Sequence, residues 1–191
     1  MPHALSLPSP LAAELAQLFV RMDAAYGQAA RQAGFACRGC AQNCCRSLFF
    51  HYTLAEYLYL KAGLEALPAA ERATIRQRAE AIPDPAAPAG VMCPLNAADR
   101  CLLYAQRPMI CRLHGIPHRL RRPDGKQQIG QGCDDFYRQC GKGVQPLLDR
   151  TPLYVEMARL ERALRGRTGY GGRIRMTVAQ MILAVANGGL L

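Results

Sequence analysis

Residues 37–45 read CRGCAQNCC, and this stretch determines how the rest of the chain must be organised. It places four thiols within nine residues, and a two-residue gap between cysteines lets both thiolates reach one tetrahedral centre from a tight turn. Gly34 and Gly39 give the backbone the freedom that such a turn needs. Without a metal, so dense a group of thiols would be an oxidation liability. The stretch therefore predicts a metal-binding cysteine cluster.

Five more cysteines follow along the chain, at Cys93, Cys101, Cys111, Cys133 and Cys140. The spacing does not match two common metal motifs. A ferredoxin run requires Cys-x2-Cys-x2-Cys, and a zinc ribbon requires a second Cys-x2-Cys. The adjacent cysteines 44 and 45 leave two alternatives open, because their side chains diverge: they serve two different centres, or one binds metal while the other packs.

Composition and charge narrow the class of protein. The chain has 191 residues, nine cysteines and a formal net charge of +10. It contains no apolar run of the roughly 20 residues that a membrane span needs, and residues 1–20 lack the features of a signal peptide. We therefore expect a cytoplasmic protein, in which disulfides are rare and metal ligation explains the cysteines better. Metal-bound thiolates would offset part of the positive charge, so nucleic-acid binding is a minority hypothesis.

Helical patterns dominate between the cysteine-rich stretches. Apolar spacing, caps and prolines predict helices over 10–32, 53–64, 68–81, 151–165 and 177–186. Ser9 is the expected N-cap of the first helix, and Thr53 with Glu56 forms a capping box at the second. A Pro-Asp-Gly turn predicts a hairpin within 115–130, and the proline-rich segment 82–90 predicts a loop.

These elements predict a mainly α fold. We expect a single small helical domain over 1–191, with irregular cysteine-rich loops and a short β-hairpin, organised around a metal site. Residues 37–135 would form the cysteine-cluster metal-binding core, and 145–191 a C-terminal helical extension. Because the metal would tie two cysteine-bearing loops together, we also expect it to be required for folding.

The cysteine pattern resembles a known family. The run from Cys37 to Cys45, then Cys93-Pro94-Leu95, then Cys101-x2-Tyr104-x2-Arg107-Pro108-x2-Cys111-Arg112, is similar to the YkgJ-type cysteine-cluster family. That family is described as a zinc- or iron-chelating domain and is shared with the bacterial flagellin lysine N-methylases. The resemblance covers about half of the chain.

The resemblance implies a cofactor and a ligand set. The cofactor would be an iron–sulfur cluster, in the first place 4Fe-4S, or zinc. Seven cysteines match the family pattern, Cys133 is the candidate eighth ligand, and Cys140 is the spare. The expected metal ligands are Cys37, Cys40, Cys44, Cys45, Cys93, Cys101, Cys111 and Cys133.

Two arginines and three histidines are the other candidates near the metal. Arg107 and Arg112 are expected to bind the cofactor indirectly, because guanidinium groups stabilise anionic thiolate sites. His51, His114 and His118 are more often structural than ligating in such positions. The arginine groups at 119–122 and 159–167 are expected to form solvated faces, with an anionic partner as the alternative.

The sequence leaves three functional hypotheses. The first is a metal-binding protein that coordinates an iron–sulfur cluster, zinc or both, with no assigned reaction. The second is a cluster-dependent enzyme, catalysing methyl transfer or redox chemistry like the lysine N-methylases. The third is a zinc-stabilised adaptor for a protein partner. None of the catalytic residues, the partner or the oligomeric state can be inferred from the sequence.

Overall fold

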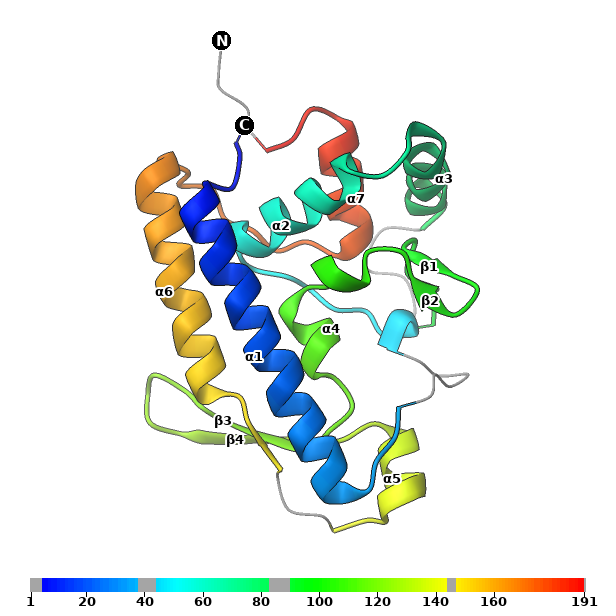
Figure 1. The fold of residues 1–191 in the computed structure, drawn as a ribbon, viewed down its shortest axis with the longest axis vertical. Coiled ribbons are helices and arrows are strands. Elements are labelled where there is room, and N and C mark those ends of the chain that lie inside the picture. Colours follow the sequence, from blue (N-terminus) through cyan, green and yellow to red (C-terminus); the bar gives the residue numbers. More distant parts are fainter. Residues whose placement is uncertain (1–4, 38–43, 83–89, 144–146, 191) are drawn as a thin grey trace.

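The structure is a computed structural model that describes residues 5–37, 44–82, 90–143 and 147–190. Its longer helices are α1 (Ser9–Ala33), α2 (Leu54–Glu65), α3 (Ala69–Glu80), α6 (Thr151–Thr168) and α7 (Val178–Ala186). Two short helices, α4 (Met109–Leu113) and α5 (Asp134–Cys140), lie in the cysteine-rich part, with 3-10 turns at Cys44–Arg46 and Tyr104–Gln106. The predicted mainly α fold is confirmed (Figure 1).

Two small sheets complete the fold. One is the hairpin of β1 (Asn96–Ala97) and β2 (Arg100–Cys101). The other has the order β4-β3-β5, in which β3 (His118–Arg121) pairs antiparallel with β4 (Gln127–Gly130) and parallel with β5 (Leu148–Asp149). The predicted hairpin within 115–130 is therefore confirmed. Most of the predicted loop 82–90 lies outside the described residues.

The long first helix forms one side of the molecule together with α6. Its apolar positions recur at three- and four-residue spacing, so they share the face that contacts α6 and α4. Figure 1 shows α1 and α6 side by side, and the ion pairs Arg21–Glu156 and Arg159–Glu14 join their exposed surfaces. Pro8 is the N-cap of α1, so the expectation that Ser9 caps this helix was wrong. The helix ends at Gly34, whose φ of 68° is the left-handed conformation that glycine adopts at low cost.

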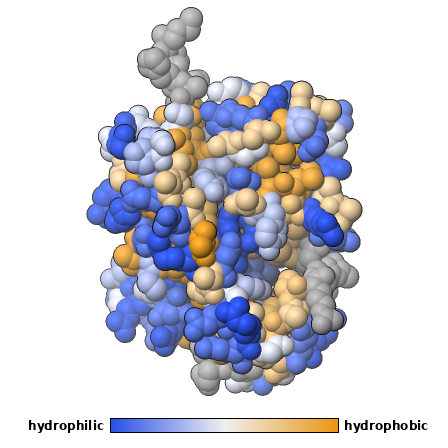
Figure 2. Space-filling model, viewed as in Figure 1, coloured by the Kyte–Doolittle hydropathy of each residue, from blue (hydrophilic) through white to orange (hydrophobic). Residues whose placement is uncertain are grey.

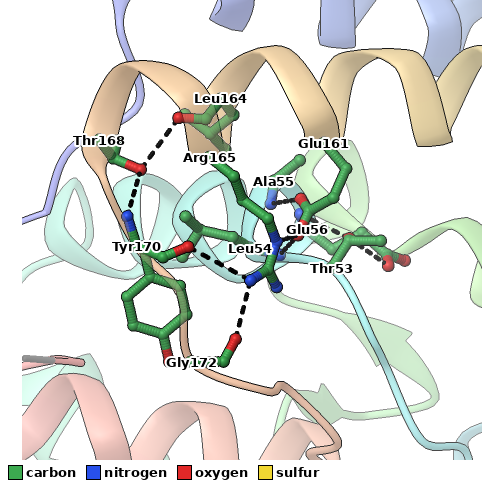
Figure 3. Close-up of polar contacts among 10 residues, drawn as sticks. All are labelled: Thr53, Leu54, Ala55, Glu56, Glu161, Leu164, Arg165, Thr168, Tyr170 and Gly172. Atoms are coloured by element: carbon green, nitrogen blue, oxygen red, sulfur yellow. Dashed lines mark hydrogen bonds and ion pairs between the residues drawn. The ribbon is translucent and has the colours of Figure 1, made fainter.

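A polar clamp fixes the start of α2 against α6 (Figure 3). The Glu161 carboxylate accepts hydrogen bonds from the backbone N–H groups of Leu54 and Ala55, each at 2.9 Å. It therefore satisfies amides that a helix N-terminus leaves unpaired, and its charge is favourable at that end of the helix dipole. Arg165 holds the carboxylate at 2.6 Å and also donates to the carbonyl of Gly172 at 2.8 Å. The predicted cap at Thr53 is confirmed, because its hydroxyl accepts from the N–H of Glu56 at 3.1 Å.

The two C-terminal helices belong to the main body. α6 packs against α1 and α2, and α7 packs against α2 and α3. Buried apolar residues of all these helices form a continuous core, which includes Leu18, Leu60, Leu160 and Ile182. Among the described residues, no helix has the length and apolar character needed to cross a membrane.

Candidate metal centre

Four cysteines from four separate segments interact around one cavity. Cys45 lies in the 3-10 turn at the end of the first cysteine stretch, and Cys93 precedes β1. Cys101 ends β2, and Cys111 lies in α4. All four line a cavity of ≈ 300 Å³, and we call them the cavity group. Cys44 also lines this cavity.

Backbone contacts bring these segments together. The N–H of Cys93 donates to the carbonyl of Cys45 at 2.7 Å, so the first cysteine stretch is joined directly to the second. The register of the β1–β2 hairpin places Cys101 opposite Asn96. Its two turn residues, Ala98 and Asp99, have φ values of 49° and 61°, the left-handed region that non-glycine residues rarely adopt. The chain between Cys93 and Cys101 therefore contains a strained turn.

The thiols of the cavity group lie close enough to affect one another's ionisation. Burial raises the pKa of Cys111, and the neighbouring thiolates of Cys93 and Cys101 raise it further. Burial, followed by the charges of Cys45 and Cys101, raises the pKa of Cys93 to about 12. Thiolates that disfavour one another in this way become stable together when a cation is bound among them. The electrostatics of the cavity group therefore fit a metal centre.

The adjacent pair of cysteines is asymmetric. The pKa of Cys45 is lowered first by a hydrogen bond from the Cys44 thiol and, against the effect of burial, by a hydrogen bond with Asn96 and the charge of Arg107. The pKa of Cys44 is raised by the same hydrogen bond and by burial. In the metal-free protein Cys45 is therefore the better thiolate of the pair.

A second group of thiols acts on the Tyr26 hydroxyl of α1. Burial raises the pKa of Tyr26, and the nearby thiols of Cys37, Cys133 and Cys44 raise it further. We call these three cysteines the Tyr26 group. Cys44 interacts with members of both groups, with Cys111 as well as with Cys37, whereas Cys45 interacts with Cys93 and Cys101. Cys40 lies outside the described residues.

Gly115 allows the Tyr26 group to approach the chain that follows α4. The N–H of Cys133 donates to the Gly115 carbonyl at 3.0 Å, and the Cys133 sulfur accepts from the N–H of Phe136 at 3.4 Å as the N-cap of α5. A Cβ atom at position 115 would lie 3.4 Å from this sulfur and 3.6 Å from the Tyr26 hydroxyl. The φ of Gly115 is +103°, so a side chain here would also be strained. Cys133 therefore has a fixed position beside Tyr26.

The two arginines that were expected beside the cofactor both pair with Asp23, but only one of them lines the cavity. Arg112 is nearly buried and donates to Asp23 at 2.6 Å, to the Arg107 carbonyl at 2.9 Å and to the Ala105 carbonyl. It is not among the residues lining the cavity. Arg107 also contacts Asp23, at 3.1 Å, but lines the cavity as well. Its Nε is buried and has no hydrogen-bond partner within the described residues. An unpaired donor beside thiols fits an anionic metal–thiolate centre.

Sequence reasoning gave little weight to His51, which also lines the cavity. Its side chain is 1% exposed, and its Nδ1 lies 3.8 Å from a carboxylate oxygen of Glu56. His114 and His118 do not line this cavity; His114 contacts the ring of Phe49, and the His118 ring lies against Gly130. The available signal was the position of His51 close to the Thr53–Glu56 capping box, which could place its ring near a buried carboxylate.

The arginine-rich faces are largely used within the molecule. Arg119 pairs with Asp149 at 3.0 Å, Arg159 pairs with Glu14 at 2.6 Å, and Arg165 belongs to the clamp of Figure 3. These pairs reduce the positive charge available to an anionic partner. Nucleic-acid binding stays a prediction, and the less favoured one.

The donor set fits a metal, although the described side chains do not enclose a single ion. Within the described ranges, no three His, Cys, Asp or Glu side chains are gathered closely enough to hold one. The cavity is lined by thiols and by apolar side chains, including Phe49, Val178 and Leu183. Figure 2 shows hydrophobic side chains gathered between α7 and the β1–β2 hairpin. The arrangement is that of a cavity lined by cysteines and apolar side chains.

The comparison with known families agrees. Residues 36–134 match the family model CxxCxxCC, described as "Putative zinc- or iron-chelating domain". Because the match covers half of the chain, the protein belongs to this family, and the predicted family is confirmed. In this chain the second spacer of the motif has three residues, Ala41 to Asn43. No curated protein and no solved structure matches the chain.

Proposed function

We propose that this protein is an iron–sulfur protein, whose cavity group holds a polynuclear cluster. The observation that carries the proposal is the single cavity of ≈ 300 Å³ on which Cys45, Cys93, Cys101 and Cys111 converge from four segments. When bound, the cluster would supply electron-transfer or Lewis-acid chemistry. The chain's own residues would hold it and exclude water from its apolar side.

The spacing of the donors favours a cluster over a single zinc ion. Four thiolates bound to one zinc at about 2.3 Å lie about 3.8 Å from one another. Such a close group of three is not found among the described residues, whereas the four thiols of the cavity group line a cavity of ≈ 300 Å³. A cluster keeps its thiolate ligands farther apart, because several metal atoms and sulfides lie between them. Arg107, with its unpaired Nε, would donate to this anionic centre.

The Tyr26 group would form a second metal site. Cys37, Cys44 and Cys133 provide three thiols, and Cys40 of the same motif would be the fourth ligand. Four cysteines suit either zinc or a second cluster. In this arrangement the adjacent cysteines 44 and 45 serve different centres.

Metal analysis of anaerobically purified protein tests the proposal. We expect iron and acid-labile sulfide, with broad absorption near about 400 nm. Cys111→Ser should lose most of the iron, Cys133→Ser should lose metal from the second site only, and Cys140→Ser is the matched control. Protein that contains zinc but no iron would favour the zinc-stabilised adaptor. Protein without stoichiometric iron or zinc would overturn metal binding altogether.

One observation favours an enzymatic role as a second candidate. Apolar residues, among them Phe49, Val178 and Leu183, line the cavity together with its thiols, as they would in a substrate site beside a reactive centre. Titration of metal-loaded protein with S-adenosylmethionine tests the methyl-transfer version. Saturable binding that Leu183→Trp weakens, without change in metal content, would support this role. Absence of binding by the loaded protein would exclude this version.

A further inference from the structure

The position of His51 is fixed by its backbone and by the surroundings of its side chain. Its backbone forms an isolated antiparallel bridge with Met176, with N–H···O distances of 2.8 and 3.0 Å. The imidazole is 1% exposed and lies between the Glu56 carboxylate and the cavity lined by the cavity group. A histidine held so firmly has little freedom to turn its ring elsewhere.

Glu56 lies beside one ring nitrogen of His51. Its carboxylate, also nearly buried, accepts from the Thr53 hydroxyl at 2.6 Å and from the N–H of Met109 at 2.9 Å. The carboxylate is therefore anchored where it faces Nδ1 of His51 at 3.8 Å. A carboxylate in this position orients the ring and favours the tautomer that carries its proton on Nδ1, as carboxylates beside metal-binding histidines do.

The other ring nitrogen has no partner in the described part of the chain. Nε2 of His51 is buried and makes no hydrogen bond there. An unpaired buried polar atom is costly, so a partner in one of the two cavities that His51 lines would stabilise it. Of these two cavities, only that of the cavity group is lined by thiols that could hold a metal. With the proton on Nδ1, Nε2 presents a lone pair. Thiolates and sulfides repel a lone pair, whereas a metal cation attracts it.

We propose that Nε2 of His51 is a nitrogen ligand of the metal centre in this cavity, and that Glu56 is its positioning residue. The proposal rests on the proposed function. His51 would join Cys45, Cys93, Cys101 and Cys111, which together give more donors than one tetrahedral ion accepts. Such a donor set suits a centre with several metal atoms, in agreement with the wide cavity.

X-ray absorption of the metal-loaded protein tests this ligand directly. For the wild type we expect sulfur neighbours together with a nitrogen contribution that shows imidazole scattering. If the protein carries an iron cluster, pulsed EPR of its reduced form should show strong coupling to a nitrogen nucleus. His51→Ala should remove both nitrogen signals, and His118→Asn is the control, because His118 does not line the cavity.

The outcomes separate the two proposals. A wild-type protein that binds no metal would overturn the proposed function. A wild-type centre bound by sulfur alone would overturn the His51 ligand while leaving metal binding intact, and this includes the case in which His51 only donates a hydrogen bond to sulfur. If His51→Ala does not fold, the wild-type spectra alone still show whether a nitrogen atom is bound to the metal. Glu56→Gln should weaken metal affinity about 10- to 100-fold while retaining the nitrogen signal. Unchanged affinity in this variant would remove Glu56 from the proposal.

Discussion

The helical body and the cysteine-bearing loops are stabilised in different ways. The core of the body is formed by fully buried residues such as Leu18, Leu60 and Ile75, which α1, α2 and α3 contribute. The loops instead consist of two-residue strands, short helices and half-buried thiols. Apolar burial orders the body, and buried residues such as Leu113 and Phe136 also anchor the loops to it. The loops, however, carry many thiols that repel one another when ionised. The comparison indicates that metal binding stabilises the loops most and the body least.

The largest effect is expected from a cavity in the body. Leu18→Ala should lower the free energy of unfolding by about 2–5 kcal/mol, because it leaves a void at a fully buried position. Val20→Ala, on the exposed side of the same helix, should change it by less than about 0.5 kcal/mol. Urea denaturation of metal-depleted protein measures both. If both substitutions changed the free energy of unfolding equally, the helical body would not be stabilised by its buried core in the absence of metal.

The clamp between α2 and α6 should have the next largest effect. Glu161→Ala leaves the N–H groups of Leu54 and Ala55 without their acceptor and breaks the pair with Arg165. A loss of about 1–3 kcal/mol is expected, since these groups are partly buried. Glu80→Ala, which breaks an exposed pair with Arg76, should cost only about 0.3–0.5 kcal/mol. Thermal unfolding compares the two variants, and a clamp variant no weaker than the exposed one would refute this role.

Metal removal should act on the loops. After chelation, the amides of Cys93 and Leu102, which bond to Cys45 and Leu95, should exchange with solvent about 10- to 100-fold faster. Amides of α1 and α2 should exchange as before, and helical circular dichroism should persist. This prediction limits the effect of the metal to the loops, whereas the sequence alone led us to expect that folding as a whole requires metal. Loss of the helical signal on chelation would restore that broader expectation.

The smallest effect concerns thiol reactivity in the metal-free protein. The lowered pKa of Cys45 keeps it a thiolate at pH values where Cys93, with a pKa of about 12, is protonated. At pH 7, iodoacetamide should therefore modify Cys45 at least about 10-fold faster than Cys93. Arg107→Gln should reduce the difference, because it removes a charge that favours the Cys45 thiolate. Peptide mapping by mass spectrometry measures both rates, and equal rates would show that the asymmetry is absent.

Much of the fold could be predicted because its signals are local. The helix over 53–64 was recognised from a cap that depends on residues three apart, and the hairpin from its turn sequence. The short helices α4 and α5 and the strand β5 were missed, since they are too short for periodicity to show. The assignment of Ser9 as a cap failed because Pro8 and Pro10 both suit a helix start.

The sequence by itself determined the family and the helical body, because motif spacing and apolar periodicity are properties of neighbouring residues. Only the tertiary structure decided which thiols line a common cavity. It placed Cys45, Cys93, Cys101 and Cys111 around one cavity, and it placed Cys44 where it lines this cavity and also lies near Tyr26. It also brought His51 to the wall of the same cavity. These contacts join residues far apart in the chain, and their pairing depends on how the helical body packs, which no local pattern records.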